Sequence, residues 1–109
     1  ERCIRMLLEW HPEMDAVFIS NDQMALGAMK VARQMGRQIP NDLAIVGFDD
    51  IPESPYFTPS LTTVRQDVAE MGRQGVKQLL TLLDDAENLE SPSAVLPPTL
   101  IVRESSVMG

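Results

Sequence analysis

Cysteine and histidine are almost absent from this 109-residue chain, which has one of each. With Cys3 alone, the chain cannot form an internal disulfide or a cysteine metal cluster, which fits a reducing cytoplasm. His11 lies in the polar turn "WHPEMD", where a solvated or capping role is expected. We therefore expect no metal site, no cofactor and no histidine-based catalytic triad.

Positive charge is also scarce, because 9 Lys and Arg stand against 16 Asp and Glu, for a net charge of -7. The basic residues are scattered and form no helix-turn-helix pattern, so we expect that this chain does not itself bind nucleic acid. No apolar run approaches the roughly 20 residues that cross a bilayer, and we expect no membrane insertion. The chain begins in helical rhythm at "ERCIRMLLEW", without an initiator Met, and we interpret it as a fragment.

The chain alternates between helix-like and strand-like segments. Apolar residues recur at helical spacing in some segments, whereas short uninterrupted apolar runs in others are typical of buried strands. The run "DLAIVGF" is apolar on both faces, as in a parallel sheet covered by helices on both sides. The predicted fold class is therefore α/β. Helices are expected at residues 1–10, 22–35 and 67–83, and strands at 16–19, 43–48, 61–64 and, interrupted by Pro97 and Pro98, 94–105.

Polar residues follow the first two predicted strands, at the points where these strands end. Ser20, Asn21 and Asp22 follow the first strand, and Asp49 and Asp50 follow the second. The carboxyl ends of parallel strands open at the same edge of a sheet, where ligands bind in open α/β folds. The sequence therefore predicts a ligand site at this edge.

In the first cluster, the residue types favour capping at some positions and ligand binding at another. Ser20 and Gln23 have the S-x-x-Q spacing of a capping box, and Asp22 would complement the positive end of the helix dipole. The amide of Asn21 offers two donors and an acceptor, which suits a hydroxyl-rich ligand. We predict that Ser20 and Asp22 serve the helix start and that Asn21 contacts a ligand.

Three interpretations are open for the second cluster, "FDD". The two aspartates could form a solvated turn, or Asp49 could accept hydrogen bonds from paired ligand hydroxyls beside the apolar face of Phe48. A third interpretation is an acidic Mg²⁺ pocket formed by Asp49 and Asp50, as in phosphoryl-transfer domains. That interpretation lacks a phosphate-cradling glycine loop and a lysine at the later strand ends.

Long stretches of the chain resemble the lactose/galactose repressor family of bacterial transcription regulators. The segments that carry the resemblance are "ISNDQMALGAMKVARQMGRQIPNDLAIVGFDDIPESPYFTPSLTTVRQD" and "LPPTLIVRESS", within residues 15–106. The resemblance implies two Rossmann-like subdomains, similar to periplasmic sugar-binding proteins, with the effector in the cleft between them. It implies that residues 1–65 form part of the C-terminal subdomain. Residues 66–94 would contain a crossover, a helix that returns to the N-terminal subdomain, and a linker. Residues 95–109 would form the final strand of the C-terminal subdomain and a tail.

The resemblance also assigns ligand contacts to individual residues. Asn21 and Asp49 match family positions that hydrogen-bond effector hydroxyls, and Gln66, in the crossover, matches a third position in the cleft. The family's aromatic residue that stacks on a sugar often comes from a loop that would precede residue 1. The identity of the effector therefore stays open.

A homodimer and operator DNA are the other partners that the resemblance implies, the DNA being bound by a headpiece outside this chain. The helix at 22–35 and the loop around Tyr56 and Phe57 match the family's dimer interface, with Leu26 as the principal contact. An ordinary core position is the alternative for Leu26, because helical spacing alone does not separate a buried face from one that meets a partner.

The function expected from these observations is the effector-binding and dimerisation region of a cytoplasmic, non-enzymatic repressor. A small sugar-like ligand would shift the equilibrium between domain arrangements and so alter operator affinity. One alternative is a periplasmic or transport-linked sugar-binding protein with the same core fold. A second is a Mg²⁺-dependent phosphoryl-transfer domain that uses Asp49 and Asp50.

Overall fold

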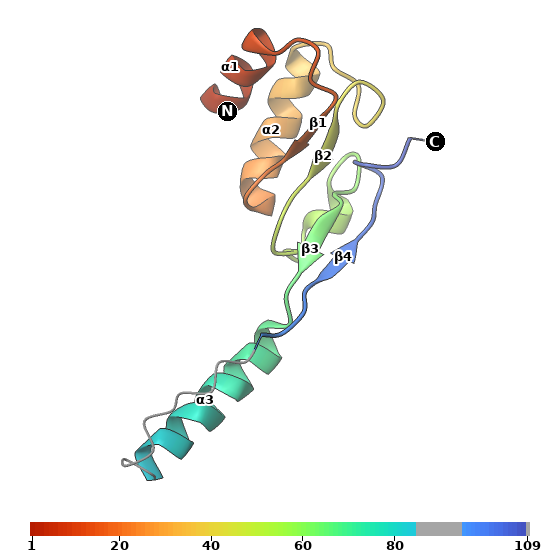
Figure 1. Cartoon of the computed structure of the whole chain (residues 1–109). Coiled ribbons are helices and arrows are strands. Elements are labelled where there is room, and N and C mark those ends of the chain that lie inside the picture. The colour runs from red at the N-terminus through yellow and green to blue at the C-terminus, as the bar shows by residue number, and fades with distance from the viewer. Residues whose placement is uncertain (85–94, 109) are drawn as a thin grey trace. The chain divides into compact units, whose positions relative to one another are not determined.

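The computed structural model describes residues 1–84 and 95–108, which form two compact units (Figure 1). Unit 1 consists of Glu1–Arg65 and the segment from Thr99 onward, and unit 2 is Gln66–Pro98. No helix in the described ranges has the length and apolar content of a membrane span. Unit 1 contains helices α1 (Arg2–Trp10) and α2 (Asp22–Gln34), the 3-10 helix η1 (Ser54–Tyr56), and strands β1 (Ala16–Phe18), β2 (Ala44–Val46), β3 (Thr63–Arg65) and β4 (Thr99–Ile101); unit 2 contains α3 (Val68–Asp84).

The strands of unit 1 combine parallel and antiparallel pairing. Strands β1 and β2 pair in parallel, with Val17 opposite Ile45. A parallel bridge from Val46 to Thr62 then places the segment leading into β3 beside β2, whereas β3 and β4 pair antiparallel. The predicted α/β fold with a parallel sheet is confirmed. Because β4 arrives from the far end of the chain, its antiparallel direction could not be predicted from the local sequence.

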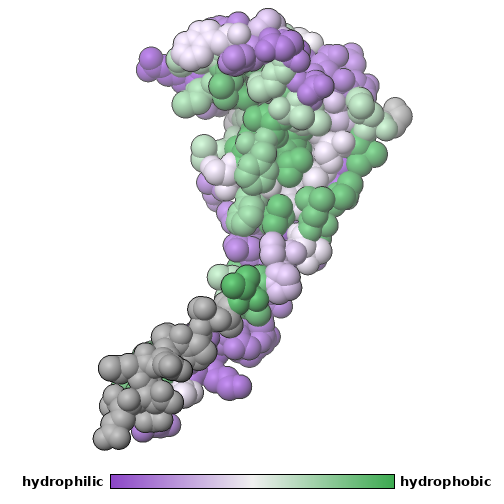
Figure 2. Space-filling view, viewed as in Figure 1, coloured by the Kyte–Doolittle hydropathy of each residue, from purple (hydrophilic) through white to green (hydrophobic). Residues whose placement is uncertain are grey.

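The core of unit 1 lies between the helices and one face of the sheet. Val17 and Ile19 pack against this core, while the side chain of Phe18, which points to the other face, is 63% exposed. Hydrophobic side chains also gather over the strands of unit 1 in the view of Figure 2. Helices α1 and α2 thus cover one face of these strands. The sequence predicts strands that are apolar on both faces. The buried core residues are Ile4, Leu8, Ala25, Ala28, Met29, Val31, Ala32, Leu43, Ile45 and Leu61.

Helix α2 carries small residues on its buried face and ends where the sequence predicts. Ala25, Ala28 and Ala32 are all buried, so the helix packs closely on the sheet. Gly36, just beyond the helix, has a φ of 78°. Glycine adopts this left-handed conformation without a steric cost and is therefore the common residue at this position.

Helix α3 is amphipathic, and none of its residues is buried. Its start is capped, because Asp67 Oδ1 accepts a hydrogen bond from the Glu70 backbone N–H at 2.9 Å. The linker is predicted at the end of the segment 66–94, and residues 85–94 of that segment lie outside the described residues. The large apolar side chains exposed on α3 are Val68, Met71, Val76, Leu79, Leu80 and Leu83.

Candidate ligand-binding site

The structure brings the two polar clusters together at the carboxyl ends of β1 and β2. The backbone N–H of Asp22 donates to the carbonyl oxygen of Phe48 at 3.0 Å, so the pair Asn21 and Asp22 lies beside Asp49 and Asp50. In each pair the second side chain is the more buried: that of Asp22 is fully buried, and that of Asp50 is 7% exposed. The first residue of each pair is left closer to solvent, since Asn21 is half-buried and Asp49 exposed.

Asn21, and not Ser20, is the N-cap of α2. Its backbone is extended, and its Oδ1 accepts a hydrogen bond from the Met24 backbone N–H at 2.8 Å. The hydroxyl of Ser20 contacts Met24 Sδ instead, at 3.4 Å, so the prediction that Ser20 caps the helix is wrong. The helix starts one residue later than a capping box on Ser20 requires, and the third amide therefore points at Asn21. Within the described part of the chain, Asn21 Nδ2 has no partner and keeps two donors for a ligand.

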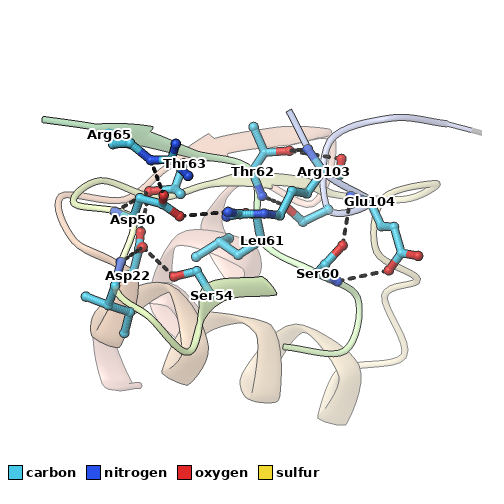
Figure 3. Close-up of polar contacts among 12 residues, drawn as sticks. Asp22, Asp50, Ser54, Ser60, Leu61, Thr62, Thr63, Arg65, Arg103 and Glu104 are labelled. Carbon is cyan, nitrogen blue, oxygen red and sulfur yellow. Dashed lines mark hydrogen bonds and ion pairs between the residues drawn. The ribbon is translucent and has the colours of Figure 1, made fainter. Parts of the chain in front are cut away.

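Asp22 lies in the first turn of α2, as expected, but its main role is different from helix-dipole complementation. Its Oδ2 accepts hydrogen bonds from Ser54 Oγ at 2.5 Å and from the Ile51 N–H at 3.0 Å (Figure 3). Its Oδ1 accepts one from Thr63 Oγ1 at 2.6 Å. A buried carboxylate needs such donors, and here they tie the start of α2 to the loop before η1 and to β3. These donors are 29 to 41 residues away in the sequence, which is why a local pattern does not reveal them.

Asp49 combines exposure with an unfavourable backbone conformation. Its φ is 111°, a region that residues other than glycine rarely adopt, and its N–H donates to the Val64 carbonyl at 2.9 Å. Such a conformation costs on the order of 1 to 3 kcal/mol, persists only where the surrounding structure imposes it, and is concentrated at functional sites. A solvated turn would explain the exposure of Asp49 but not the presence of aspartate where glycine would be less strained.

The carboxylate of Asp50 is held by two arginines. Oδ2 accepts a hydrogen bond from Arg65 Nε at 2.6 Å, and Oδ1 forms an ion pair with an Arg103 guanidinium nitrogen at 2.8 Å (Figure 3). Burial raises the pKa of the Asp50 carboxyl, but the two arginines outweigh that effect and hold the pKa below its ordinary value. The Mg²⁺ interpretation would leave Asp49 as the accessible carboxylate, because both arginines compete with a cation for Asp50.

Arg65 and Arg103 are the functional candidates that the sequence analysis missed. Arg65 ends β3 and Arg103 follows β4, 38 residues later in the chain, and their side chains come together at Asp50 only in the folded protein. The sequence feature that could have indicated the cluster is the acidic pair Asp49 and Asp50 together with an arginine at the end of each of two later strand segments. Gln66, the third predicted ligand residue, is the half-buried first residue of unit 2, and its role stays a prediction.

The three predicted interface residues differ in exposure. Leu26 is 46% exposed on α2, so it is not a core leucine in this chain. Tyr56, at the end of η1, is 85% exposed, whereas Phe57 is half-buried and packs against the core of unit 1. Leu26 and Tyr56 are therefore available to a partner, and Phe57 also stabilises its own unit.

Comparison with known proteins gives a consistent set of relatives. Residues 1–106 match the family model of the periplasmic binding protein-like domain. The chain is 41% identical over its whole length to the ribose operon repressor of Halalkalibacterium halodurans, and covers 33% of that protein. It is 39% identical over 102 residues, 94% of its length, to the HTH-type transcriptional regulator CelR of Thermobifida fusca, and covers 30% of it.

Solved structures agree with these relatives. A complex of the transcriptional regulator CelR with cellobiose matches 96% of the chain with a TM-score of 0.86 and 39% identity. The lac repressor dimer bound to operator and the anti-inducer ONPF matches 98% of the chain, with a TM-score of 0.86 and 31% identity. The chain covers 32% and 37% of these two structures, and thus spans about a third of the length of its relatives.

Proposed function

Because the chain belongs to the family of periplasmic binding protein-like domains, we propose that it is the effector-binding and dimerisation region of a bacterial transcriptional repressor. Its similarity to a ribose operon repressor and to a regulator solved with cellobiose supports this function. A small sugar-like effector would bind the parent protein and change its affinity for operator DNA. With a net charge of -7, this chain would leave DNA binding to another part of the parent protein.

We assign effector binding in unit 1 to Asn21 and Asp49. The observation that carries this assignment is the exposed, strained Asp49 beside an Asn21 that keeps two N–H donors. A sugar hydroxyl both donates and accepts hydrogen bonds, so a carboxylate acceptor next to an amide donor is suited to bind adjacent hydroxyls. The family resemblance adds Gln66 as a third contact.

We further propose that the parent protein is a homodimer that uses α2 and the loop around η1. Leu26 and Tyr56 are exposed apolar or aromatic residues there, the kinds of side chain from which interfaces derive most of their energy. The similar lac repressor structure is that of a dimer. Phe57 would support Tyr56 from the core side.

We also propose which subdomain of the core each unit belongs to. We assign unit 1 to the C-terminal subdomain of the core and α3 to the N-terminal one. The exposed apolar stripe of α3, which includes Val76, Leu79 and Leu83, supports the assignment, because such a stripe needs an apolar surface to cover it.

A non-enzymatic, cytoplasmic repressor is favoured over the two alternatives. The relatives above are transcription regulators, which speaks against a transport-linked role. The engagement of Asp50 by Arg65 and Arg103 speaks against a phosphoryl-transfer site built on two aspartates. A regulator of this kind acts on DNA and so works in the cytoplasm.

Calorimetric titration of the parent protein with ribose, cellobiose and lactose tests this function. We expect one of these sugars to bind, and Asp49→Asn and Asn21→Ser each to weaken its binding about tenfold or more through lost hydrogen bonds. Asparagine tolerates positive φ and serine preserves the N-cap, so both variants should keep the local fold.

Asp42→Asn is the matched control, because Asp42 lies just before β2, at the opposite end of that strand from Asp49. It should bind the sugar like the wild type. Unchanged affinity in both site variants would contradict the site, and a wild-type protein that binds none of the three sugars would contradict a sugar effector of this class.

A further inference from the structure

The peptide at Asp49 and Asp50 has two consecutive residues with positive φ, 111° and 51°. Neither residue is glycine, and a chain adopts such a conformation only where its surroundings impose it. The Asp49 N–H is held by the Val64 carbonyl at 2.9 Å, and the Asp50 N–H donates to Thr63 Oγ1 at 3.3 Å. Both backbone contacts come from β3.

The side chain of Asp50 adds the strongest restraint on this peptide. Two cationic groups converge on a carboxylate that is 7% exposed, Arg65 from the end of β3 and Arg103 from the segment after β4. Ion pairs and hydrogen bonds between charged groups are stronger when they are shielded from water. Asp50 is thereby fixed to the end of β3 and to the segment that follows β4.

The two arginines are not equivalent. The Arg103 side chain is 14% exposed, and a second guanidinium nitrogen donates to the Leu61 carbonyl at 2.9 Å. The backbone N–H of Arg103 also donates to Thr62 Oγ1 at 2.8 Å. The Arg65 side chain is 55% exposed, and among the described residues its polar contact is the one to Asp50. Arg103 is thus an oriented partner, and Arg65 a partly solvated one.

We propose that Asp50, held by Arg65 and Arg103, is a positioning residue that fixes the neighbouring Asp49 carboxylate in the geometry needed to bind the effector. Its own carboxylate is buried and occupied, so it acts through Asp49 and not through contact with the ligand. This inference rests on the proposed role of Asp49. It explains why the second residue of the pair is also an aspartate, which a ligand contact at Asp49 alone does not require.

A double-mutant cycle in the parent protein tests the inference, with the sugar that binds among ribose, cellobiose and lactose. We expect Asp50→Asn to lower the affinity about tenfold in the wild-type background and to have much less effect in an Asp49→Asn background. Loss of general stability would weaken binding equally in both backgrounds. Glu104→Gln is the control, because Glu104 is an exposed carboxylate of the same unit that accepts from the Ser60 N–H, and it should leave the affinity unchanged.

Arginine-to-lysine variants provide a test that keeps the charge of the cluster. Arg103→Lys should lower the affinity more than Arg65→Lys does, since lysine cannot contact Asp50 and the Leu61 carbonyl with two separate nitrogens of a planar group. Equal effects of Asp50→Asn in both backgrounds, or unchanged affinity in Asp50→Asn and Arg103→Lys, would overturn the inference while leaving the proposed function in place. A wild-type protein that binds none of the sugars would overturn both.

Discussion

Replacing Gly47 with alanine should disrupt the buried contacts that support the site. Gly47 follows β2, and a Cβ at this position would lie 2.3 Å from Asp22 Oδ1 and 3.0 Å from a methyl carbon of Leu61. Asp22 Oδ1 is the atom that accepts the hydrogen bond from Thr63 Oγ1 at 2.6 Å. The carboxylate cannot swing away freely, because Ser54 and the Ile51 N–H hold its other oxygen. Gly47→Ala must therefore displace either Asp22 or the strand.

The expected cost follows from two terms. Losing one hydrogen bond to a buried charged group costs about 1.5 to 3 kcal/mol, and forcing an extra methyl group into a packed core costs about 1 to 3 kcal/mol. Together they amount to roughly 2.5 to 6 kcal/mol, against a typical domain stability of about 5 to 15 kcal/mol. The variant should remain partly folded but lose much of its local stability.

Hydrogen exchange measured by mass spectrometry reports this loss locally in the parent protein. At about 1.4 kcal/mol for each tenfold change, amides in residues 43–50 should exchange at least about 60-fold faster. Gly27→Ala, in α2, is the matched control. A Cβ at Gly27 would lie at an ordinary contact distance of 3.6 Å from Glu1 Cγ, and alanine favours a helix more than glycine does, so exchange should be unchanged or slower. If Gly47→Ala changed exchange in 43–50 by less than about fivefold, the rigid placement of Asp22 would be wrong.

Three further predictions concern assembly, capping and pH. Leu26→Ala should raise the dimer dissociation constant about tenfold or more in sedimentation experiments without unfolding the monomer. The control Leu7→Ala, at a leucine that is 40% exposed on α1, should leave the dissociation constant unchanged. A Leu26 variant that stays dimeric on dilution would place the interface elsewhere. Asn21→Ala should cost about 1 kcal/mol of stability in denaturant titrations and Asn21→Ser much less, and equal losses would contradict the N-cap. Folding lowers the pKa of the Asp50 carboxyl. The ionised carboxylate therefore contributes its full stabilisation above the unfolded pKa of about 4, and this stabilisation is lost as the pH falls through the lower pKa of the folded state. Unfolding titrations should therefore show a smaller loss of stability below about pH 4 for Asp50→Asn than for the wild type, and parallel curves would refute the ion-pair cluster.

The sequence by itself determined which segments are helices and strands and where the two polar clusters fall. Helix α2 and strands β1 and β2 arise from local periodicity and from short apolar runs, so the secondary structure of residues 16–48 could be predicted without tertiary information. The parallel direction of β1 and β2 follows from the helix between them, and this alone predicts that Asn21 and Asp49 lie at one edge. Helical spacing also marked Leu26 but could not decide whether it faces the core.

Only the tertiary structure decided the roles within each polar pair. Whether Ser20 or Asn21 caps α2 depends on a shift of one residue in the helix start, which sequence patterns do not resolve. The burial of Asp22 and Asp50 depends on donors from Ser54, Arg65 and Arg103, which come from distant parts of the chain. A carboxylate is stable in a protein interior only when such partners are present, and their arrival is set by how the strands assemble, not by the residues that flank it.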